Sequence, residues 1–419
     1  MSQGFPDLYQ TMLRAKAAAN ALGASGGKAR NDFLRALSGL IESGFGAVLA
    51  ANLRDVEKAR AGGSGQALVD RLTLDEKRLR ELNAGLAACV ALPDPLGRVE
   101  DLSTRPDGLV VGRRRIPLGL IGFICEARPG AVVEAAAMAI KSGNALLAKP
   151  GRESLETSRL FGDLIAEALG QAGLPPGAIT VLPDLGREEL KFAIAQDGIL
   201  DLVIPRGGEG LIRFVADNSK VPVLKHYKGV NHLYVDRLAE TGMAIGLTVN
   251  GKCNRPSTCN ALECLLVHRE RLDDFLPAAV GALLEKGVRI FACERARAKV
   301  PGLGEAAEGH FGREFLDLTL AVKVVDDMEE ALAHILKYGS RHTEAICTSD
   351  LGAAGDFLAR VDASCVMVNA STRLNDGGCL GLGAEIGIST SKIHAYGPMG
   401  LRELTTTKFV VTGRGHLRR

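Results

Sequence analysis

The sequence predicts an α/β protein in which a doubly wound parallel sheet is followed by a second α/β domain and a small C-terminal element. Short apolar segments alternate with helical segments at regular intervals between residues 118 and 224, which is typical of successive βαβ units. A second alternating series begins near residue 238, and a strand-like segment at 408–412 follows the Gly/Pro stretch at 397–400. These three observations define the fold class.

The individual elements follow from the spacing of apolar residues. The first hundred residues are rich in Ala, Leu and Arg and repeat apolar positions at helical spacing, so we expect helices there, followed by a short strand near 108–112. Continuous apolar runs predict strands buried on both faces at 118–125, 145–149, 179–182, 200–204 and 221–224. Helices are expected between them at 131–141, 155–172, 188–196 and 211–218. The second series predicts strands at 261–267, 318–325 and 364–369 and helices at 238–251, 272–286 and 328–337.

The composition indicates a globular protein and excludes several functional classes. The 419 residues are enough for two or three domains, and 46% hydrophobic and 24% charged residues are ordinary values. A net charge of +2 gives no electrostatic reason to expect nucleic acid or an anionic membrane as a partner. No apolar run reaches the length of a transmembrane helix, and residues 1–7 lack the pattern of a secretory signal.

The cysteines indicate a reducing compartment. Nine cysteines, an odd number scattered along the chain, do not form a disulfide framework, and we expect reduced thiols in the cytoplasm. Cys253, Cys259 and Cys264 are close in sequence, but no pair of histidines at metal-binding spacing accompanies them. We therefore expect no metal site.

Cys259 is the strongest candidate for a catalytic group. Pro256 and the small polar run 257–260 place it in a turn directly before the predicted strand 261–267. A thiol at the end of a strand can face a cleft, whereas a thiol in the middle of a buried strand cannot. Free cysteines are most often small buried hydrophobic residues, so the position alone leaves a structural role open.

Two basic loops that contain glycine are candidates for binding phosphate. One runs from Lys149 to Ser154 and includes Arg152, and the other is Pro205–Gly210; each follows a predicted strand and precedes a helix. Free N–H groups and the dipole at a helix N-terminus attract anions, and cofactors bind at the carboxyl edge of such sheets. The G-x-G-x-x-G fingerprint is absent, and each loop taken alone is equally well explained as a turn. Together they favour a phosphorylated dinucleotide.

A glycine-dense segment at 377–387 lies between the hydroxyl-rich stretches 371–373 and 389–391. Flexible backbone, hydroxyl groups and an arginine suit the binding of a small anionic substrate. The alternative is a mobile linker, although linkers seldom carry Leu and Ile so regularly. Four histidines are candidate bases, with a structural role as the alternative for each: His226, His232, His334 and His342.

Four longer motifs carry a resemblance to a known family. They are IPLGLIGFICEARP at 116–129, the segment 250–263 with RPSTCN, VMVNASTR at 366–373, and 381–390 followed by GPMGL at 397–401. Together they resemble the γ-glutamyl phosphate reductase family of the aldehyde dehydrogenase superfamily, over a range that ends near residue 409. The resemblance implies an aldehyde-dehydrogenase-like fold and the NADPH-dependent reduction of L-glutamyl 5-phosphate to L-glutamate 5-semialdehyde, with release of phosphate, in proline biosynthesis.

The resemblance also implies roles for particular residues. Cys259 matches the nucleophile that forms a thioester, Lys149 matches a residue at the adenosine ribose, and Glu314 one at the nicotinamide ribose. Arg152 stands where a cation suits the 2′-phosphate of NADPH. The expected cofactor-binding residues are Lys149, Arg152, Arg206, Gly207, Gly208 and Glu314. The expected substrate-binding residues are Glu126, Arg128, Arg255, Asn260, Ser371, Arg373 and Gly383.

Three positions depart from the family pattern. Lys225 replaces the glutamate that acts as general base in oxidising aldehyde dehydrogenases, which suits a reaction in which phosphate, not water, is the other acyl partner. Ala127 replaces the asparagine of their oxyanion hole, so the oxyanion donors are not identified; the backbone N–H of Cys259 is one candidate. Asn231 replaces an expected cysteine, with no evident consequence.

The expected organisation has three parts. Residues 1–225 form the NADPH-binding domain with an oligomerisation hairpin near 107–117, residues 226–390 form the catalytic domain, and residues 391–419 form a C-terminal segment with an oligomerisation strand. A terminal strand needs an edge to pair with, so we expect a homodimer or homotetramer. Functional coupling to glutamate 5-kinase is a further expectation. Two alternatives remain: an aldehyde dehydrogenase that makes a free acid, and a non-catalytic member that binds nucleotide.

Overall fold

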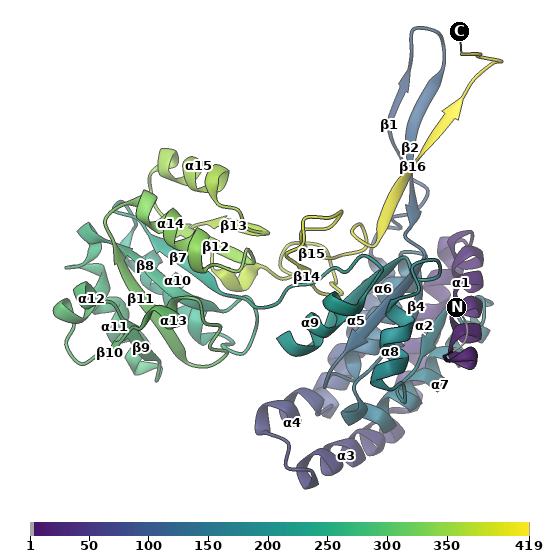
Figure 1. The fold of residues 1–419 in the computed structure, drawn as a ribbon, viewed down its shortest axis with the longest axis horizontal. Helices are drawn as coiled ribbons and strands as arrows, with labels where there is room; N and C mark the ends of the chain where they lie inside the picture. Colours follow the sequence, from purple (N-terminus) through teal and green to yellow (C-terminus); the bar gives the residue numbers. More distant parts are fainter. Residues whose placement is uncertain (1–3, 419) are drawn as a thin grey trace. The chain divides into compact units, whose positions relative to one another are not determined.

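The computed structural model describes residues 4–418, which form two compact units (Figure 1). The first unit contains the chain up to Lys225 together with Leu382–Gly387 and the residues from Met399 onward. The second contains His226–Gly381 and Ile388–Pro398. Residues 382–387, expected within the catalytic domain, thus pack with the first unit. Residues 391–398, expected in the C-terminal segment, pack with the second.

The first unit begins with the predicted helices. They are α1 (Pro6–Gly23), α2 (Gly27–Ser43), α3 (Phe45–Ala61), α4 (Gln66–Leu72) and α5 (Glu76–Ala91). In α1 the apolar residues at helical spacing, including Leu8, Met12 and Ala15, are all buried. Leu8, Met12 and Ala15 pack in one core with strands of the parallel sheet that follows. The apolar periodicity therefore marks the face of α1 that packs on the sheet.

The doubly wound part is a four-stranded parallel sheet with the order β5-β4-β3-β6. Its strands are β3 (Leu120–Cys125), β4 (Ala145–Lys149), β5 (Ile179–Val181) and β6 (Leu202–Arg206). Its helices are α6 (Gly130–Lys141), α7 (Leu155–Gln171), α8 (Arg187–Ile194) and α9 (Glu209–Asn218), with the 3-10 turn η1 (Arg152–Ser154) before α7. The strand order reverses at β3, which pairs with β4 on one side and β6 on the other.

Two strand predictions in this sheet need correction. The strand expected at 200–204 is β6, which begins at Leu202. The segment 221–224 is not a strand: it makes one isolated bridge, between Val203 and Val223. Pro222 has no N–H to donate, so a ladder cannot be extended through it.

A separate three-stranded antiparallel sheet has the order β1-β2-β16. Its strands are β1 (Val99–Thr104), β2 (Val110–Pro117) and β16 (Thr405–Thr412). Figure 1 shows β16, in yellow, beside the hairpin of β1 and β2. The terminal strand therefore finds its edge within its own chain, on β2, and it does not need a partner chain for this pairing.

The second unit is built on a seven-stranded parallel sheet with the order β10-β9-β11-β8-β7-β12-β13. The strands are β7 (Asn231–Val235), β8 (Leu262–His268), β9 (Arg289–Ala292), β10 (Gly304–Glu305), β11 (Thr319–Val325), β12 (Thr343–Cys347) and β13 (Cys365–Val368). The helices are α10 (Thr241–Cys253), α11 (Phe275–Glu285), α12 (Glu294–Lys299), α13 (Glu308–Phe311), α14 (Met328–Tyr338) and α15 (Leu351–Arg360). Shorter elements are η2 (Arg269–Arg271), η3 (Thr372–Leu374), β14 (Ile388–Ser389) and β15 (Gly397–Pro398).

The central strands β7, β8 and β12 are completely buried, although they include polar residues such as His232, Glu263 and Glu344. Of these three strands only β8 was predicted, because the polar residues interrupt the apolar runs of β7 and β12. The helix expected from residue 238 begins at Thr241, because the Glu240 side chain accepts hydrogen bonds from the N–H groups of Gly242 and Met243 and caps it there. No single described helix is long and apolar enough to cross a membrane. The bent pair α2–α3 passes such a test by length and composition only.

Candidate active site

Cys259 lies in the turn between α10 and β8, as the sequence predicts, and it is half-buried. The turn is closed by Thr258, whose N–H donates to the carbonyl of Arg255 at 3.3 Å and whose hydroxyl lies 2.8 Å from the same oxygen. The Ala261 N–H donates to the Thr258 carbonyl at 3.0 Å. These bonds hold the thiol just before the amino end of a buried strand.

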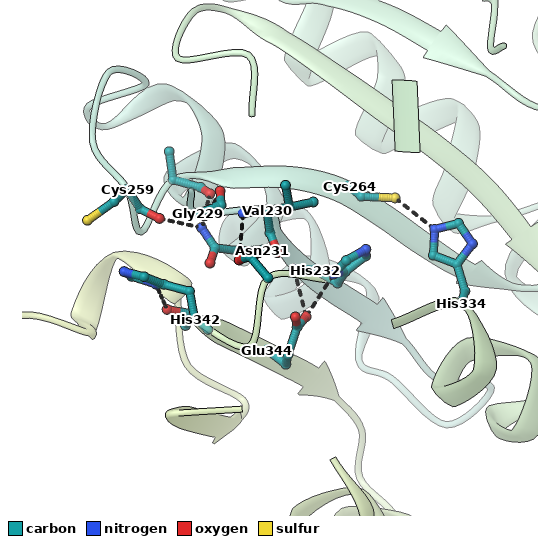
Figure 2. Close-up of polar contacts among 12 residues, drawn as sticks. Gly229, Val230, Asn231, His232, Cys259, Cys264, His334, His342 and Glu344 are labelled. Carbon is teal, nitrogen blue, oxygen red and sulfur yellow. Dashed lines mark hydrogen bonds and ion pairs between the residues drawn. The ribbon is translucent and has the colours of Figure 1, made fainter. Parts of the chain in front are cut away.

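Two neighbours hold the backbone of Cys259. The side-chain amide of Asn231, the first residue of β7, donates to the carbonyl of Cys259 at 2.8 Å (Figure 2) and to that of Ala261 at 2.6 Å. Gly229 packs directly on the Cys259 carbonyl: a Cβ at residue 229 would lie 1.8 Å from that oxygen. Asn231, whose effect was not evident from the sequence, thus positions the turn that carries Cys259, and the close approach requires glycine at 229.

A buried ion pair closes the loop that carries Cys259. Lys252, near the end of α10, contacts Glu263 on β8 at 2.6 Å, and both side chains are inaccessible to solvent. Burial raises the pKa of Glu263 to about 7, against the attraction of Lys252.

Glu314 accepts a hydrogen bond from the N–H of Gly229 at 2.9 Å. The predicted nicotinamide-ribose residue therefore shares an anchoring glycine with Cys259.

Two histidines lie beside the thiol. One ligand atom each of His226, Cys259 and His342 lie within 4.8 Å of one another; we call these three residues the outer cluster. His226 is half-buried, and its Nδ1 lies 2.9 Å from the carbonyl of Ile388. A carbonyl only accepts, so Nδ1 carries a proton, and Nε2 of the neutral ring is an acceptor.

A second group of the same residue types lies within the sheet. His232 on β7, Cys264 on β8 and His334 on α14 are all buried; we call them the inner cluster. Cys264 Sγ is 3.6 Å from His334 Nε2, and His232 Nδ1 is 2.8 Å from the buried Glu344 carboxylate (Figure 2). Burial opposes the charge of His232, but Glu344 raises its pKa to about 10. Burial lowers the pKa of His334 to about 2.

The sequence has no histidine pair at metal-binding spacing near these cysteines, but that does not exclude histidines beside them in the folded chain. The fold places two histidines at Cys259 and two at Cys264, from positions distant in sequence. In the inner cluster Cys264 contacts His334 and His232 is paired with Glu344, while His232 Nε2 and His334 Nδ1 have no partner among the described residues. The signal that sequence reasoning missed is positional: His226 and His342 both come shortly before a strand of the same parallel sheet as Cys259.

Two arginines near Cys259 make its surroundings positive. Burial lowers the pKa of Arg373, and the positive charge of Arg255 lowers it further, while Cys259 acts in the opposite direction. Both guanidinium groups and the thiol therefore lie within electrostatic range of one another. Arg255 is exposed, and Arg373 Nε donates to the Asn254 side chain at 3.3 Å. Two adjacent guanidinium groups suit a substrate with more than one negative charge.

Asn260 and Ser371 hold the loop that carries Arg373. The Asn260 amide donates to the carbonyls of Arg373 (3.3 Å) and Asn375 (3.0 Å). Ser371 is the N-cap of η3 and accepts from the Arg373 N–H at 3.3 Å. Both side chains are buried. The contacts that the structure gives them position Arg373, and direct substrate contact by either residue stays a prediction.

In the first unit, the predicted cofactor residues gather at the carboxyl edge of the four-stranded sheet. Lys149 ends β4, Arg152 lies in η1 directly after it, and Arg206 ends β6. Burial is the main cause that lowers the pKa of Lys149, and the nearby charge of Arg152 lowers it further. Arg152 is exposed and makes no ion pair with any residue from 4 to 418. This cationic edge lies beside β3, where the strand order reverses.

The residues at the end of β6 and in the loop after it form hydrogen bonds with other residues of the first unit. Glu126, directly after β3, accepts a hydrogen bond from the N–H of Gly208 at 2.8 Å. A Cβ at Gly207 would lie 2.4 Å from the same carboxylate. Arg206 donates to the carbonyl of Ile386 at 2.9 Å. Glu126, predicted to bind substrate, thus contacts the predicted cofactor loop, and Arg206 holds segment 382–387.

Three further predicted positions also lie in the first unit. Arg128 is exposed after β3. Ala127 adopts a left-handed conformation with φ 44°, and its N–H donates to Glu153. Gly383 has φ 77°, and a Cβ there would lie 2.2 Å from Leu92, so the residue must be glycine for packing. A substrate role for Arg128 and Gly383 stays a prediction.

Comparison with known proteins identifies the general class of protein to which the chain belongs. A model of the aldehyde dehydrogenase family matches residues 75–288, slightly more than half of the chain. The chain has the fold of that class: an acetylating aldehyde dehydrogenase from Geobacillus thermoglucosidasius, only 17% identical, superposes over 99% of this chain and 98% of its own with a TM-score of 0.69. The predicted aldehyde-dehydrogenase-like α/β fold is confirmed.

More similar proteins define the family within this class. A γ-glutamyl phosphate reductase of Thermus thermophilus is 55% identical over 93% of this chain and 94% of its own length. That of Sorangium cellulosum is 50% identical over 97% and 96%. The crystal structure of the Thermotoga maritima γ-glutamyl phosphate reductase superposes with a TM-score of 0.96 at 42% identity, over 98% of this chain and all of the other. The chain belongs to the γ-glutamyl phosphate reductase branch of the aldehyde dehydrogenase family.

Proposed function

We propose that this chain reduces L-glutamyl 5-phosphate to L-glutamate 5-semialdehyde with NADPH, as a step of proline biosynthesis, through a thioester on Cys259. The γ-glutamyl phosphate reductases to which it is similar carry this substrate in their names. The observation that supports the mechanism is the half-buried Cys259 in a rigid turn with Arg255 and Arg373 within electrostatic range. A thiolate next to two cations can attack an anionic acyl phosphate.

The steps follow from the groups at this site. The Cys259 thiolate adds to the γ-carbonyl carbon, a C–S bond forms, and phosphate leaves with the electron pair of the C–O bond. His226, an acceptor at Nε2, takes the thiol proton beforehand. Hydride addition to the thioester carbon gives a thiohemiacetal anion, which reforms the carbonyl and expels the thiolate as the semialdehyde is released. Arg255 and Arg373 bind the phosphate and the α-carboxylate.

A nicotinamide cofactor supplies the hydride when it is bound, as in the aldehyde dehydrogenase family. The residues present fit the phosphorylated form of the cofactor: Lys149 and the exposed guanidinium of Arg152 lie together at the sheet edge where dinucleotides bind. These two residues would hold the adenosine ribose and its 2′-phosphate. Gly207 and Gly208 would approach the pyrophosphate, and Glu314 would hold the nicotinamide ribose.

The decisive experiment is NADP⁺ reduction by glutamate semialdehyde with and without inorganic phosphate. The proposal expects turnover that depends on phosphate, with one glutamyl phosphate formed per NADPH. Phosphate-independent formation of glutamate would instead identify an aldehyde dehydrogenase that makes a free acid. Absence of turnover under both conditions would favour a non-catalytic member.

The choice of NADPH can be tested separately. Arg152→Glu replaces a cation with an anion, so it should raise KM for NADPH by at least about tenfold more than KM for NADH. Arg159→Glu is the matched control, because Arg159 is exposed on α7 and pairs with Asp184 at the surface. An equal change for both cofactors in Arg152→Glu would show that the 2′-phosphate is recognised elsewhere.

Assembly is part of the same proposal. The outer strands β1 and β16 have free edges within the described chain and expose large apolar side chains, Leu102 (65%), Phe409 (68%) and Val411 (57%). We propose a homodimer or homotetramer through these edges, to be measured by light scattering with Phe409→Glu as the disrupting variant. The nine cysteines form no disulfide in the described chain, which suits the cytoplasm, where glutamate 5-kinase would supply the labile acyl phosphate.

A further inference from the structure

His342 is a fully buried histidine with an unpaired ring nitrogen beside the candidate nucleophile. It immediately precedes β12, and its Nδ1 lies 2.7 Å from the hydroxyl oxygen of Thr343. Its Nε2 has no hydrogen-bond partner among the described residues. Buried polar groups are normally hydrogen-bonded, so this nitrogen can take a ligand atom as its partner.

The neighbours of Thr343 decide which nitrogen of His342 carries the proton. The side-chain amide of Asn375 donates to the Thr343 hydroxyl oxygen at 2.8 Å. That hydroxyl has one proton of its own, and the acceptor that the described residues provide for it is Nδ1 of His342. Thr343 therefore donates to Nδ1. In the neutral ring the proton is on Nε2, which makes the unpaired atom a donor.

The ring is neutral at physiological pH. Burial and the nearby His226 lower the pKa of His342 to about 3. A neutral imidazole N–H that is fixed by its surroundings can stabilise negative charge developing on a substrate oxygen. His226 has the opposite tautomer, with Nδ1 protonated by its bond to the Ile388 carbonyl. The two histidines thus offer one acceptor and one donor.

The position of this donor suits an oxygen next to the sulfur. A ring nitrogen of His342 lies within 4.8 Å of Cys259 Sγ, and Figure 2 shows the nitrogen that does not bond the hydroxyl on the side of Cys259. Nε2 makes no hydrogen bond to the sulfur. An oxygen on the carbon that the sulfur attacks lies next to the sulfur, so a donor within 4.8 Å of Sγ is in position to reach it.

We propose that the Nε2–H of His342 is the hydrogen-bond donor for the oxyanion that forms when the Cys259 sulfur adds to the acyl carbon. The inference rests on the proposed function and supplies a side-chain oxyanion donor, which the sequence left unidentified. As the C–S bond forms, the carbonyl π electrons move to oxygen; as phosphate leaves, they return. The same donor serves the thiohemiacetal anion. The Nε2 proton stays on the ring throughout.

In this proposal Thr343 and Asn375 are positioning residues, because they act through His342. Thr343 selects the tautomer, and Asn375 orients the Thr343 hydroxyl. Thr343→Val removes the proton that Nδ1 accepts, so the ring can place its own proton on either nitrogen. The variant should therefore lower kcat, and Thr343→Ser should restore most of the loss.

The kinetic test compares two substitutions of His342. His342→Leu removes the donor and should lower kcat by roughly 10²–10³-fold with little change in KM. His342→Gln places an amide N–H near the position of Nε2 and should recover at least about tenfold of that loss. A leucine variant within about threefold of the parent would overturn the proposal, and so would equal losses in the two variants.

Alkylation of Cys259 by iodoacetamide shows whether His342 donates its hydrogen bond to a substrate oxygen or to the Cys259 sulfur. We define the pH midpoint of alkylation as the pH at which the alkylation rate is half of its maximum. Because the proposal has Nε2–H donate to the substrate oxygen and not to the sulfur, this midpoint in His342→Gln should equal that of the parent. A midpoint raised by about one pH unit or more would mean that His342 stabilises the thiolate, which contradicts the proposal.

The tautomer can be measured without substrate. In ¹⁵N-histidine-labelled protein, NMR should show the His342 proton on Nε2 and none on Nδ1, the signal being assigned by its loss in His342→Gln. A proton on Nδ1 overturns the inference even where no variant is active. Failure of the proposed function would appear differently, as a parent that does not convert glutamate semialdehyde.

Discussion

The outer and inner clusters contain the same residue types in the same unit, yet their chemistry differs. In the inner cluster, Cys264 is bonded to His334, and His232 is paired with the Glu344 carboxylate inside the sheet. In the outer cluster, Cys259 is half-buried, His226 donates to a backbone carbonyl, and His342 has an unpaired donor. The inner cluster is completely buried, although His232 Nε2 and His334 Nδ1 have no hydrogen-bond partner among the described residues, whereas the outer cluster includes two side chains that solvent reaches.

Position along the strands explains the difference. His232, Cys264 and Glu344 lie within β7, β8 and β12, at paired positions of adjacent strands. His226, Cys259 and His342 precede these same strands. Within a buried strand, side chains face covered surfaces; before its amino end, turns can present side chains to solvent. A shift of a few residues along the sheet thus separates a structural cluster from a reactive one.

Replacing the cysteine of each cluster with serine should give the largest difference between the two clusters, in kcat for one and in the free energy of unfolding for the other. Cys259→Ser should lower kcat by at least about 10⁴-fold with cofactor binding intact, because a hydroxyl supplies almost no nucleophile at neutral pH. Cys264→Ser should lower the free energy of unfolding and leave kcat within a few fold. Steady-state kinetics and urea unfolding of both variants measure this. Wild-type turnover by Cys259→Ser would disprove the covalent mechanism.

Breaking the ion pair of the inner cluster should have the next largest effect. Glu344→Gln leaves His232 as a buried cation without its carboxylate and should reduce the free energy of unfolding by about 3–5 kcal/mol. Glu329→Gln is the control, because Glu329 pairs with Arg360 at the surface and should cost about 1 kcal/mol or less. Similar losses in the two variants would show that the buried pair is not charged.

Acid should destabilise the protein through one histidine of each cluster. Burial lowers the pKa of His334 to about 2 and of His342 to about 3, against a usual 6.5. Below 6.5 the unfolded chain binds protons that these two rings reject in the folded chain, so the stability that each ring contributes falls as the pH falls, by roughly 1.4 kcal/mol per unit. His232 is already charged when folded, since Glu344 raises its pKa to about 10 despite burial, and adds nothing to this slope.

Urea unfolding at several pH values between about 7 and 4.5 measures the slope. His342→Gln should remove about half of the contribution from these two rings, and His416→Gln, at an exposed position, should not alter it. Glu263, whose pKa burial raises to about 7, contributes a slope of opposite sign in this range, so the test is the difference between parent and variant; equal slopes in the parent and in His342→Gln would contradict neutral burial of His342.

The smallest effect is expected at His226. His226→Asn removes the acceptor that takes the thiol proton, so the pH midpoint of Cys259 alkylation should rise by less than about one unit. The unchanged midpoint expected for His342→Gln is the matched comparison within the same cluster. A midpoint that does not move in His226→Asn would exclude His226 as the base for Cys259.

Much of the fold was predictable because helices and buried strands leave local periodic patterns. The α1 periodicity, the strand at β8 and the turn that holds Cys259 were all placed from spacing and turn residues. The segment 221–224 failed because its apolar character was correct but Pro222 interrupts the ladder. The C-terminal strand was identified, but its partner β2 was not, since pairing between distant segments leaves no periodic signal.

The sequence by itself determined which residues carry reactive groups and where each lies along its element: Cys259 before a strand, Lys149 and Arg206 after one. Only the tertiary structure decided which of these groups meet. Parallel strands bring their amino ends to one edge, so His226 and His342 come to lie beside Cys259 although they are far apart in the chain. The protonation of His342 depends on Thr343 and Asn375 as well. Periodicity records local backbone geometry, whereas the partners of a side chain depend on strand order and register.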